Sequence, residues 1–160
     1  MASPGQYLTF LLNAQLYGVP VASVREINRV IEVTPIPQTP PFVVGVINLR
    51  GRVIPVIGLR QKFGLPAAEN SKETCIIIIE ASTGQVGVIV DAVRSVVDLS
   101  EKQIEATPSL GDAAIENVIM GLGKIDDKVM ILVDVAKSVS DQNLKQVIEV
   151  GANAPLPKSA

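Results

Sequence analysis

The sequence offers few side chains that could do catalytic chemistry. It contains no histidine, which removes the commonest general base, the commonest zinc ligand and any Ser–His or Cys–His nucleophile pair. The one cysteine, Cys75, begins the most apolar run of the chain, so a small buried side chain is favoured over a reactive thiol. Asp126 and Asp127 are adjacent acids, but Asp is common in turns. The Gly-Leu-Gly-Lys run at 121–124 lacks the Walker spacing. The sequence therefore predicts no enzyme, no metal and no cofactor.

With catalysis and metal binding not predicted, the remaining candidates are the charged side chains that could bind a partner. Arg50 and Arg52 flank Gly51, with Asn48 two residues before Arg50, where a hairpin tip is expected. Such a tip is either a solvated feature that suppresses edge aggregation or a guanidinium group that binds a partner's carboxylate or carbonyl oxygens. Arg25-Glu26 has the same two interpretations, because it can also be the solvent side of a half-buried strand. The residue types alone leave both open.

Composition limits the fold and the partners. The chain has 160 residues, of which 48% are hydrophobic and 3% aromatic, and its Val and Ile content favours strands. A net charge of −2 and few aromatic residues for stacking argue against nucleic acid as a partner. We see no secretion signal at the start and no apolar run near the roughly 18 residues of a membrane span. A cytoplasmic protein with no membrane insertion is expected.

Short apolar runs separated by turns predict a chain made mainly of strands. The hairpin around Arg50-Gly51 is indicated by two apolar runs on either side of an X-Gly pair. The unbroken run 75–79 predicts a strand covered on both faces. The other expected elements are strands within 7–12, 16–27 and 86–90, a helical turn at 59–63 ended by Gly64, a capping box at 100–103, a short helix around 144–148 and a loose tail at 151–160.

An internal repeat is the most informative pattern. The segment 18–27 matches 87–96 at an offset of 69, and positions within 45–57 match 121–133 at an offset of 76. Both matches occur in the same order, and a two-residue turn lies between apolar runs in each copy. The repeat predicts two similar small β units packed together, each of the SH3-like or OB-like kind.

The run 45–59, GVINLRGRVIPVIGL, closely resembles the signature stretch of CheW-like coupling domains. Further matches are 17–27, 34–37, 86–93 and 121–123, so the resemblance covers about residues 6–148. Two positions depart from the family pattern: Gly58 stands where an acid is usual, and Pro20 where a polar residue is common. The missing acid puts the contacts near Arg60 in doubt.

The resemblance implies an all-β fold of two packed five-stranded SH3-like barrels with short helices, including one near the C-terminus. Residues 1–160 would form a single CheW-like domain. We expect subdomain one at about 16–70, subdomain two at about 75–138, segments 6–13 and 139–150 packing on the barrels, and a flexible tail at 151–160.

The resemblance also implies a function. Such a domain is a non-catalytic adaptor between the cytoplasmic helical tip of a chemoreceptor and the regulatory domain of the CheA histidine kinase, recruited to receptor arrays at the inner face of the membrane. Two alternatives stay open: a protein of the same fold in another chemosensory pathway, such as twitching motility or second-messenger control, and an OB-like nucleic-acid module. The partner-binding residues implied by the family are Val24, Glu26, Gly45, Asn48, Arg50, Gly51, Val86, Gly87, Val90 and Val93.

Overall fold

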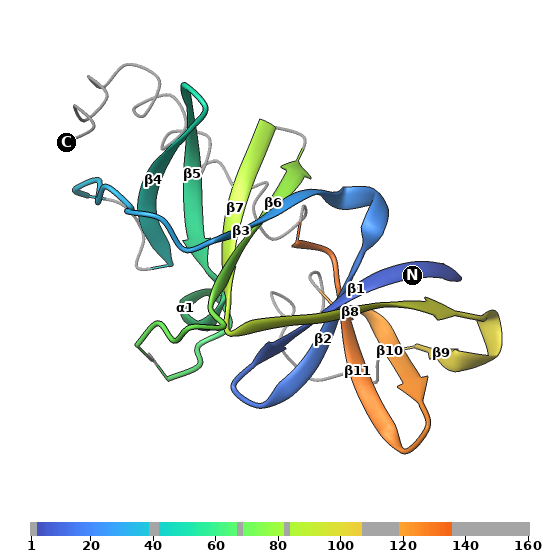
Figure 1. Ribbon diagram of the computed structural model, residues 1–160. Coiled ribbons are helices and arrows are strands. Elements are labelled where there is room, and N and C mark those ends of the chain that lie inside the picture. The colour runs from blue at the N-terminus through green and yellow to red at the C-terminus, as the bar shows by residue number, and fades with distance from the viewer. Residues whose placement is uncertain (1–2, 39–41, 67–68, 82–83, 107–118, 136–160) are drawn as a thin grey trace.

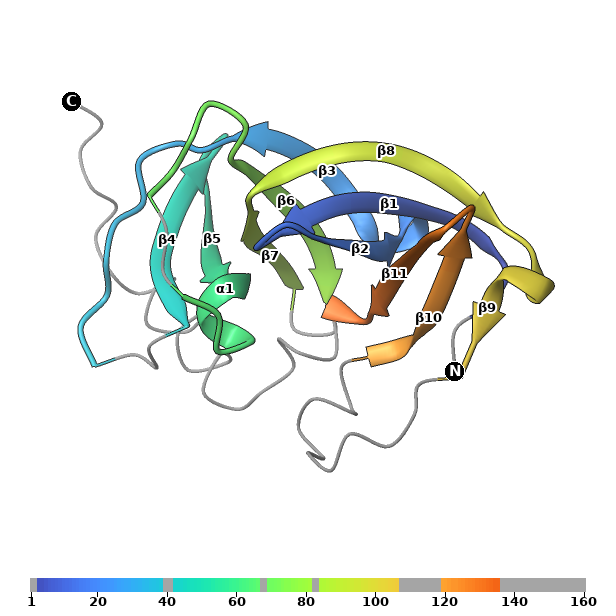
Figure 2. The same cartoon turned by 90° about the horizontal axis from the view of Figure 1, so that it is seen from below.

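The computed structural model describes residues 3–38, 42–66, 69–81, 84–106 and 119–135, and over these ranges the chain is mainly β (Figure 1). The strands form two sheets that pack against each other (Figure 2). The larger sheet has the order β8-β1-β2-β11-β10-β9, made of Ala92–Leu99, Gly5–Leu12, Gln15–Pro20, Lys128–Val133, Ile119–Ile125 and Ile104–Glu105. The smaller has the order β3-β6-β7-β5-β4, made of Val24–Arg29, Cys75–Ala81, Gly84–Val90, Arg52–Gly58 and Val43–Leu49. The prediction of a mainly β fold with two packed units is confirmed, although one sheet has six strands.

Within the described residues, three short helices join the strands. They are η1 (Val21–Ser23), α1 (Leu59–Lys62) and η2 (Glu101–Gln103). The helical turn predicted at 59–63 is confirmed, and Gly64 follows it with a φ of +70°. The predicted capping box is also present, since the Ser100 N–H donates to Gln103 Oε1 at 2.9 Å. The helix expected around 144–148, the packing segment 139–150 and the tail 151–160 lie outside the described residues.

The sheets divide the chain differently from the predicted boundary between residues 70 and 75. The smaller sheet is built from Val24 to Val90, and the larger one combines Gly5–Pro20 with strands that follow Ala92. The reason is that the β1–β2 hairpin sits in the middle of the larger sheet, where β1 pairs with β8 and β2 pairs with β11. The chain therefore passes between the sheets twice, through η1 and through Asp91.

The internal repeat corresponds to matching strands. At the offset of 69, β2 and β3 correspond to β7 and β8, and at 76, β4 and β5 correspond to β10 and β11. Gly18 lies opposite Leu132 and Gly87 opposite Val56 in the parallel pair at the centre of each sheet. A Cβ at Gly87 would come within 2.9 Å of Ile76 Cγ2, and one at Gly18 within 2.9 Å of Met130 Sδ. Both copies of the repeat use glycine because a neighbouring side chain fills this space.

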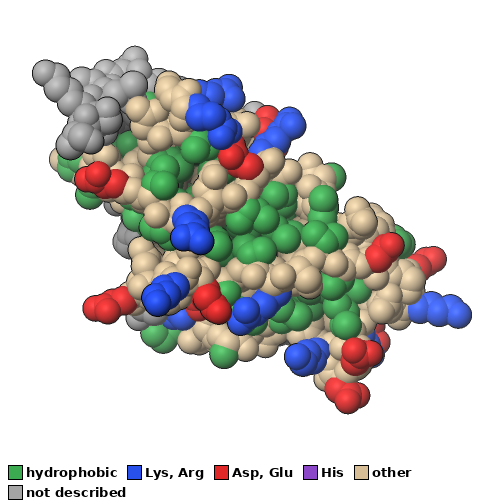
Figure 3. Space-filling model, viewed as in Figure 1, with side chains coloured by type: hydrophobic (Ala, Val, Ile, Leu, Met, Phe, Trp, Pro, Cys, Tyr) green, Lys and Arg blue, Asp and Glu red, His purple; other side chains and the backbone are tan. Residues whose placement is uncertain are grey.

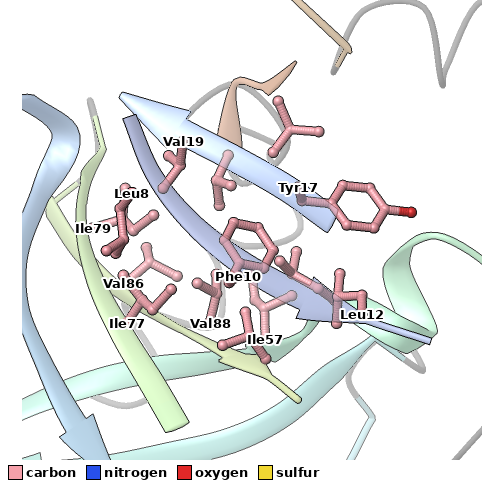
Figure 4. Packing of buried hydrophobic residues seen from close by; sticks show 14 of the residues in the cluster. Leu8, Phe10, Leu12, Tyr17, Val19, Ile57, Ile77, Ile79, Val86 and Val88 are labelled. Carbon is pink, nitrogen blue, oxygen red and sulfur yellow. The ribbon is translucent and has the colours of Figure 1, made fainter. Parts of the chain in front are cut away.

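The main hydrophobic core lies between the two sheets (Figure 4). Ile77 and Ile79 point into this core from β6. Ile76 and Ile78 point to the other face of the smaller sheet, into a second hydrophobic core. All four side chains are fully buried. The prediction that the run 75–79 forms a strand covered on both faces is confirmed.

Candidate partner-binding surface

An apolar seam runs between β3 and β8, which are the outermost strands of the two sheets. In Figure 1 the two strands lie on the same face of the molecule and run in opposite directions, and Figure 2 agrees. Figure 3 shows apolar side chains gathered on this face between the two ends of the molecule. The seam is where the core between the sheets reaches the surface.

Four side chains line the seam. Cross-strand pairing places Val24 opposite Ile79 and Ile27 opposite Ile77, so both share the face of the core between the sheets. On β8, Val93 and Val96 pair with Phe10 and Leu8, which belong to the same core. Val24 and Val93 are half-buried, while Ile27 is 42% and Val96 53% exposed. Exposed apolar side chains that continue a core are typical of a protein-binding surface.

The other predicted valines and glycines lie below this surface. Val86 and Val90 are fully buried in the core between the sheets, so they support the seam from beneath and do not line it. Gly45 has a φ of +152°, and a Cβ there would meet the backbone of Thr34, which bridges to β4. Gly87 makes room for Ile76. In this structure both glycines therefore allow close packing within the chain itself.

The predicted hairpin residues form a separate group at the β4–β5 turn. Arg50 and Gly51 have φ angles of +52° and +84°, as a two-residue turn with positive φ at both positions requires. Asn48 Oδ1 accepts a hydrogen bond from the Gly51 N–H at 2.9 Å. Asn48 and Gly51 thus shape the tip, which presents the Arg50 side chain with 72% of its area exposed.

Arg50 is held by Glu26 from β3. The guanidinium group donates through both terminal nitrogens to the carboxylate, and the Nη1–Oε2 distance is 3.3 Å. Hydrogen bonds from Arg50 and then from Asn28 lower the pKa of Glu26. Glu26 lies opposite Ile78, a residue of the second core, so the Arg50–Glu26 pair sits on the other face of β3 from the seam. A partner's carboxylate would have to compete with Glu26 for this guanidinium group.

A third cluster, around Asp91, ties the two sheets together. Arg60 Nε donates to Asp91 Oδ1 at 2.8 Å and Arg60 Nη2 to Oδ2 at 2.5 Å. The Asn13 N–H, in the β1–β2 turn, donates to the same carboxylate at 2.9 Å. Arg60 is the main cause of the lowered pKa of Asp91. The doubt raised by Gly58 is resolved, since Arg60 is well paired and the Gln61 side chain occupies the space beside Gly58.

A pocket of about 490 Å³ lies beside Arg60 and Asp91 at the end of the smaller unit, lined also by Val44 and Ile89. Within the described ranges, no group of three or more His, Cys, Asp or Glu side chains is placed to hold a metal ion. In the same part of the chain, no helix has the length and apolar character to cross a bilayer.

Sequence reasoning missed Ile27, Val96 and the Arg60–Asp91 pair. Ile27 and Val96 occupy equivalent positions in the repeat at the offset of 69, so the repeat contained a signal for them. Alternation along one strand was a poor guide, because a bulge between Val24 and Glu26 changes which residues share a face. The Arg60–Asp91 pair spans 31 residues and no local pattern predicts it.

Comparison with known proteins supports one family throughout. The model of the CheW-like domain matches residues 6–143. The chemotaxis protein CheW of Bacillus subtilis is 35% identical over 87% of this chain and 88% of that protein, and that of Klebsiella aerogenes is 34% identical over 91% and 87%. The crystal structure of the scaffolding protein TtCheW from Thermoanaerobacter tengcongensis aligns with a TM-score of 0.79 at 36% identity, covering 88% of this chain and 96% of that one.

Proposed function

Because the chain belongs to the CheW family, we propose that it is a non-catalytic adaptor that couples chemoreceptors to the CheA histidine kinase in bacterial chemotaxis. It would work in the cytoplasm, recruited to receptor arrays at the inner face of the membrane. The observation that carries this proposal is the apolar seam between β3 and β8, since an exposed extension of the core is suited to a helix with an apolar stripe. The receptor's helical tip is the partner proposed for it.

The kinase's regulatory domain is proposed to bind elsewhere on the surface. That domain is expected to resemble this one in fold, so pairing between barrels through strand ends and hairpin tips is the natural arrangement. The β4–β5 tip, with Arg50 exposed, and the β10–β11 tip lie at opposite ends of the molecule (Figure 1). An adaptor that binds its receptor at the central seam leaves both ends free for the kinase.

Replacing Val96 by Asp tests the receptor site. A buried carboxylate opposite an apolar helix is costly, so we expect Val96→Asp to weaken binding of a purified chemoreceptor tip fragment at least about tenfold. Val129→Asp is the matched control, because Val129 has a similar exposed fraction, 48% against 53%, but lies on β11 away from the seam. Calorimetry with each variant, after circular dichroism has confirmed folding, measures the difference. Equal affinities of the two variants would contradict the proposed receptor site.

A further inference from the structure

The two strands that border the seam carry equivalent residues with one informative exception. At the offset of 69, Val24 corresponds to Val93 and Ile27 to Val96, so the apolar positions are conserved between the two copies of the repeat. The next positions on the same face are Arg29 and Asp98. The repeat therefore places opposite charges at equivalent positions.

Strand pairing puts both charges on the seam side of their strands. Arg29 lies opposite Cys75, a residue that packs against the core between the sheets. Asp98 lies opposite Gln6, two residues from Leu8 on β1, which pairs with Val96. Since alternate residues of a strand share a face, Arg29 continues the row that holds Ile27, and Asp98 continues the row that holds Val96. Both residues are exposed.

The direction of the strands puts the two charges at opposite ends of the seam. Because β3 and β8 run in opposite directions (Figure 1), the repeat relates them by an approximate twofold axis through the middle of the seam. Arg29 and Asp98 each lie at the far end of their own strand. The twofold axis therefore exchanges apolar residues of the seam for apolar residues, but it exchanges the positive charge of Arg29 for the negative charge of Asp98.

The neighbouring charged positions of the repeat, Arg25 and Arg94, do not differ in charge between the two strands. Arg25 pairs with Glu80 at 2.9 Å, and Arg94 lies 3.8 Å from Glu73, so each equivalent arginine has its own carboxylate. Among the ion pairs of the described residues, neither Arg29 nor Asp98 takes part. Their charges are available to a partner.

We propose that Arg29 and Asp98 determine the direction in which a helical partner lies along the seam. This inference rests on the proposed function and adds a specificity to it. The partner is a helix whose apolar stripe ends in acidic side chains at the Arg29 end and in basic side chains at the Asp98 end. Charges at the rim of an interface fix orientation and register more than they add affinity, and the opposite orientation would bring like charges together at both ends.

A charge exchange tests the proposal. The probe is a chemoreceptor tip fragment with a nitroxide attached at the acidic or at the basic end of its apolar stripe, and the readout is broadening of amide signals of the isotope-labelled full-length protein. With the wild type, we expect the label at the acidic end to broaden amides around Arg29 and the label at the basic end to broaden those around Asp98. In the double variant Arg29→Asp/Asp98→Arg the two patterns should be exchanged.

Matched variants separate the roles of charge and apolar contact. The exchange Arg25→Glu/Glu80→Arg keeps an ion pair beside the seam and should leave the broadening unchanged. Arg29→Asp alone should weaken binding about two- to fivefold at low salt, with less effect at high salt. If the double variant Arg29→Asp/Asp98→Arg bound the fragment in the same direction as the wild type does, the inference would be overturned and the proposed function would stand. A wild-type protein that does not bind the fragment at the seam would overturn both.

Discussion

Asp91 has an unusual position for a single residue, since it is the whole connection between β7 and β8. At this point the chain leaves one sheet for the other. Its carboxylate accepts hydrogen bonds from Arg60, next to the end of β5, and from the Asn13 N–H in the β1–β2 turn. Asp91 thus links elements of both sheets at one of the two crossings, and its loss would loosen their relative placement.

Replacing Asp91 by Asn should lower the free energy of unfolding by about 1–3 kcal/mol at neutral pH, since hydrogen bonds to charged groups contribute on that order. The pKa of Asp91 is lower in the folded protein than its ordinary value near 3.8. The stabilisation is therefore present in full above about pH 5 and is lost as the pH falls below about 4 through the folded pKa. Urea unfolding of the wild type and of Asp91→Asn at pH 7, 4 and 3 should give stability curves that converge at low pH. A constant difference would contradict the role of the ionised carboxylate.

Replacing Arg50 by Glu tests the hairpin tip. Surface ion pairs contribute little to stability, so the loss of the Arg50–Glu26 pair should leave the fold intact. The reversed charge should nevertheless weaken receptor control of the kinase, measured as CheA phosphorylation in a reconstituted array. Arg52→Glu is the matched control at the same tip, with Arg52 exposed and not among the ion pairs of the described residues. Unchanged kinase control with Arg50→Glu would contradict a role of the Arg50 side chain in coupling.

At the scale of elements, local patterns predicted what local geometry determines. The Arg50-Gly51 turn, the helical turn after Gly58 and the Ser100–Gln103 capping box all depend on residues that are close in sequence, and each was predicted. The position of the β1–β2 hairpin was not. Its place between β8 and β11 depends on pairings across more than 80 residues, which a hairpin signal does not specify.

Replacing Gly45 by Ala tests how closely the segment around Thr34 packs against β4, to which Thr34 is joined by an isolated β-bridge. Gly45→Ala would push a Cβ against the backbone of Thr34 at a residue whose φ is +152°, so we expect a loss of about 2–4 kcal/mol. Gly58→Ala is the control, since the atoms nearest to its Cβ would belong to the end of the flexible Gln61 side chain, which can move. Thermal unfolding of both variants gives the comparison. If Gly58→Ala proved as destabilising as Gly45→Ala, the rigid-backbone explanation would be wrong.

At the scale of the whole molecule, the repeat predicted two units but not how the chain is shared between them. Each copy of the repeat starts with a hairpin, β1–β2 in the first and β6–β7 in the second, and each hairpin joins the sheet formed by the other copy. Sequence similarity between the copies identifies equivalent strands, but it does not show which copy contributes the hairpin to each sheet. The predicted boundary between 70 and 75 separates the copies of the repeat, whereas the sheets combine them.

Cutting the chain between residues 68 and 69 tests this shared architecture. The fragment 1–68 would hold β1–β5 and the fragment 69–160 would hold β6–β11, so neither contains all the strands of either sheet. Each fragment alone should lack cooperative unfolding, because each leaves the core between the sheets open. Mixing them should restore the β spectrum and a cooperative transition. Cooperative folding of either fragment by itself would contradict the arrangement.

The two crossings have a mechanical consequence for signalling. β3 leaves the crossing at η1, β8 leaves the crossing at Asp91, and these same two strands border the seam. A helix bound between them, as proposed, would contact the strands that leave both crossings, which are the points about which the two halves of the molecule can rotate. Its binding would then change the angle between the two ends of the molecule, and with it the relative orientation of any proteins bound there.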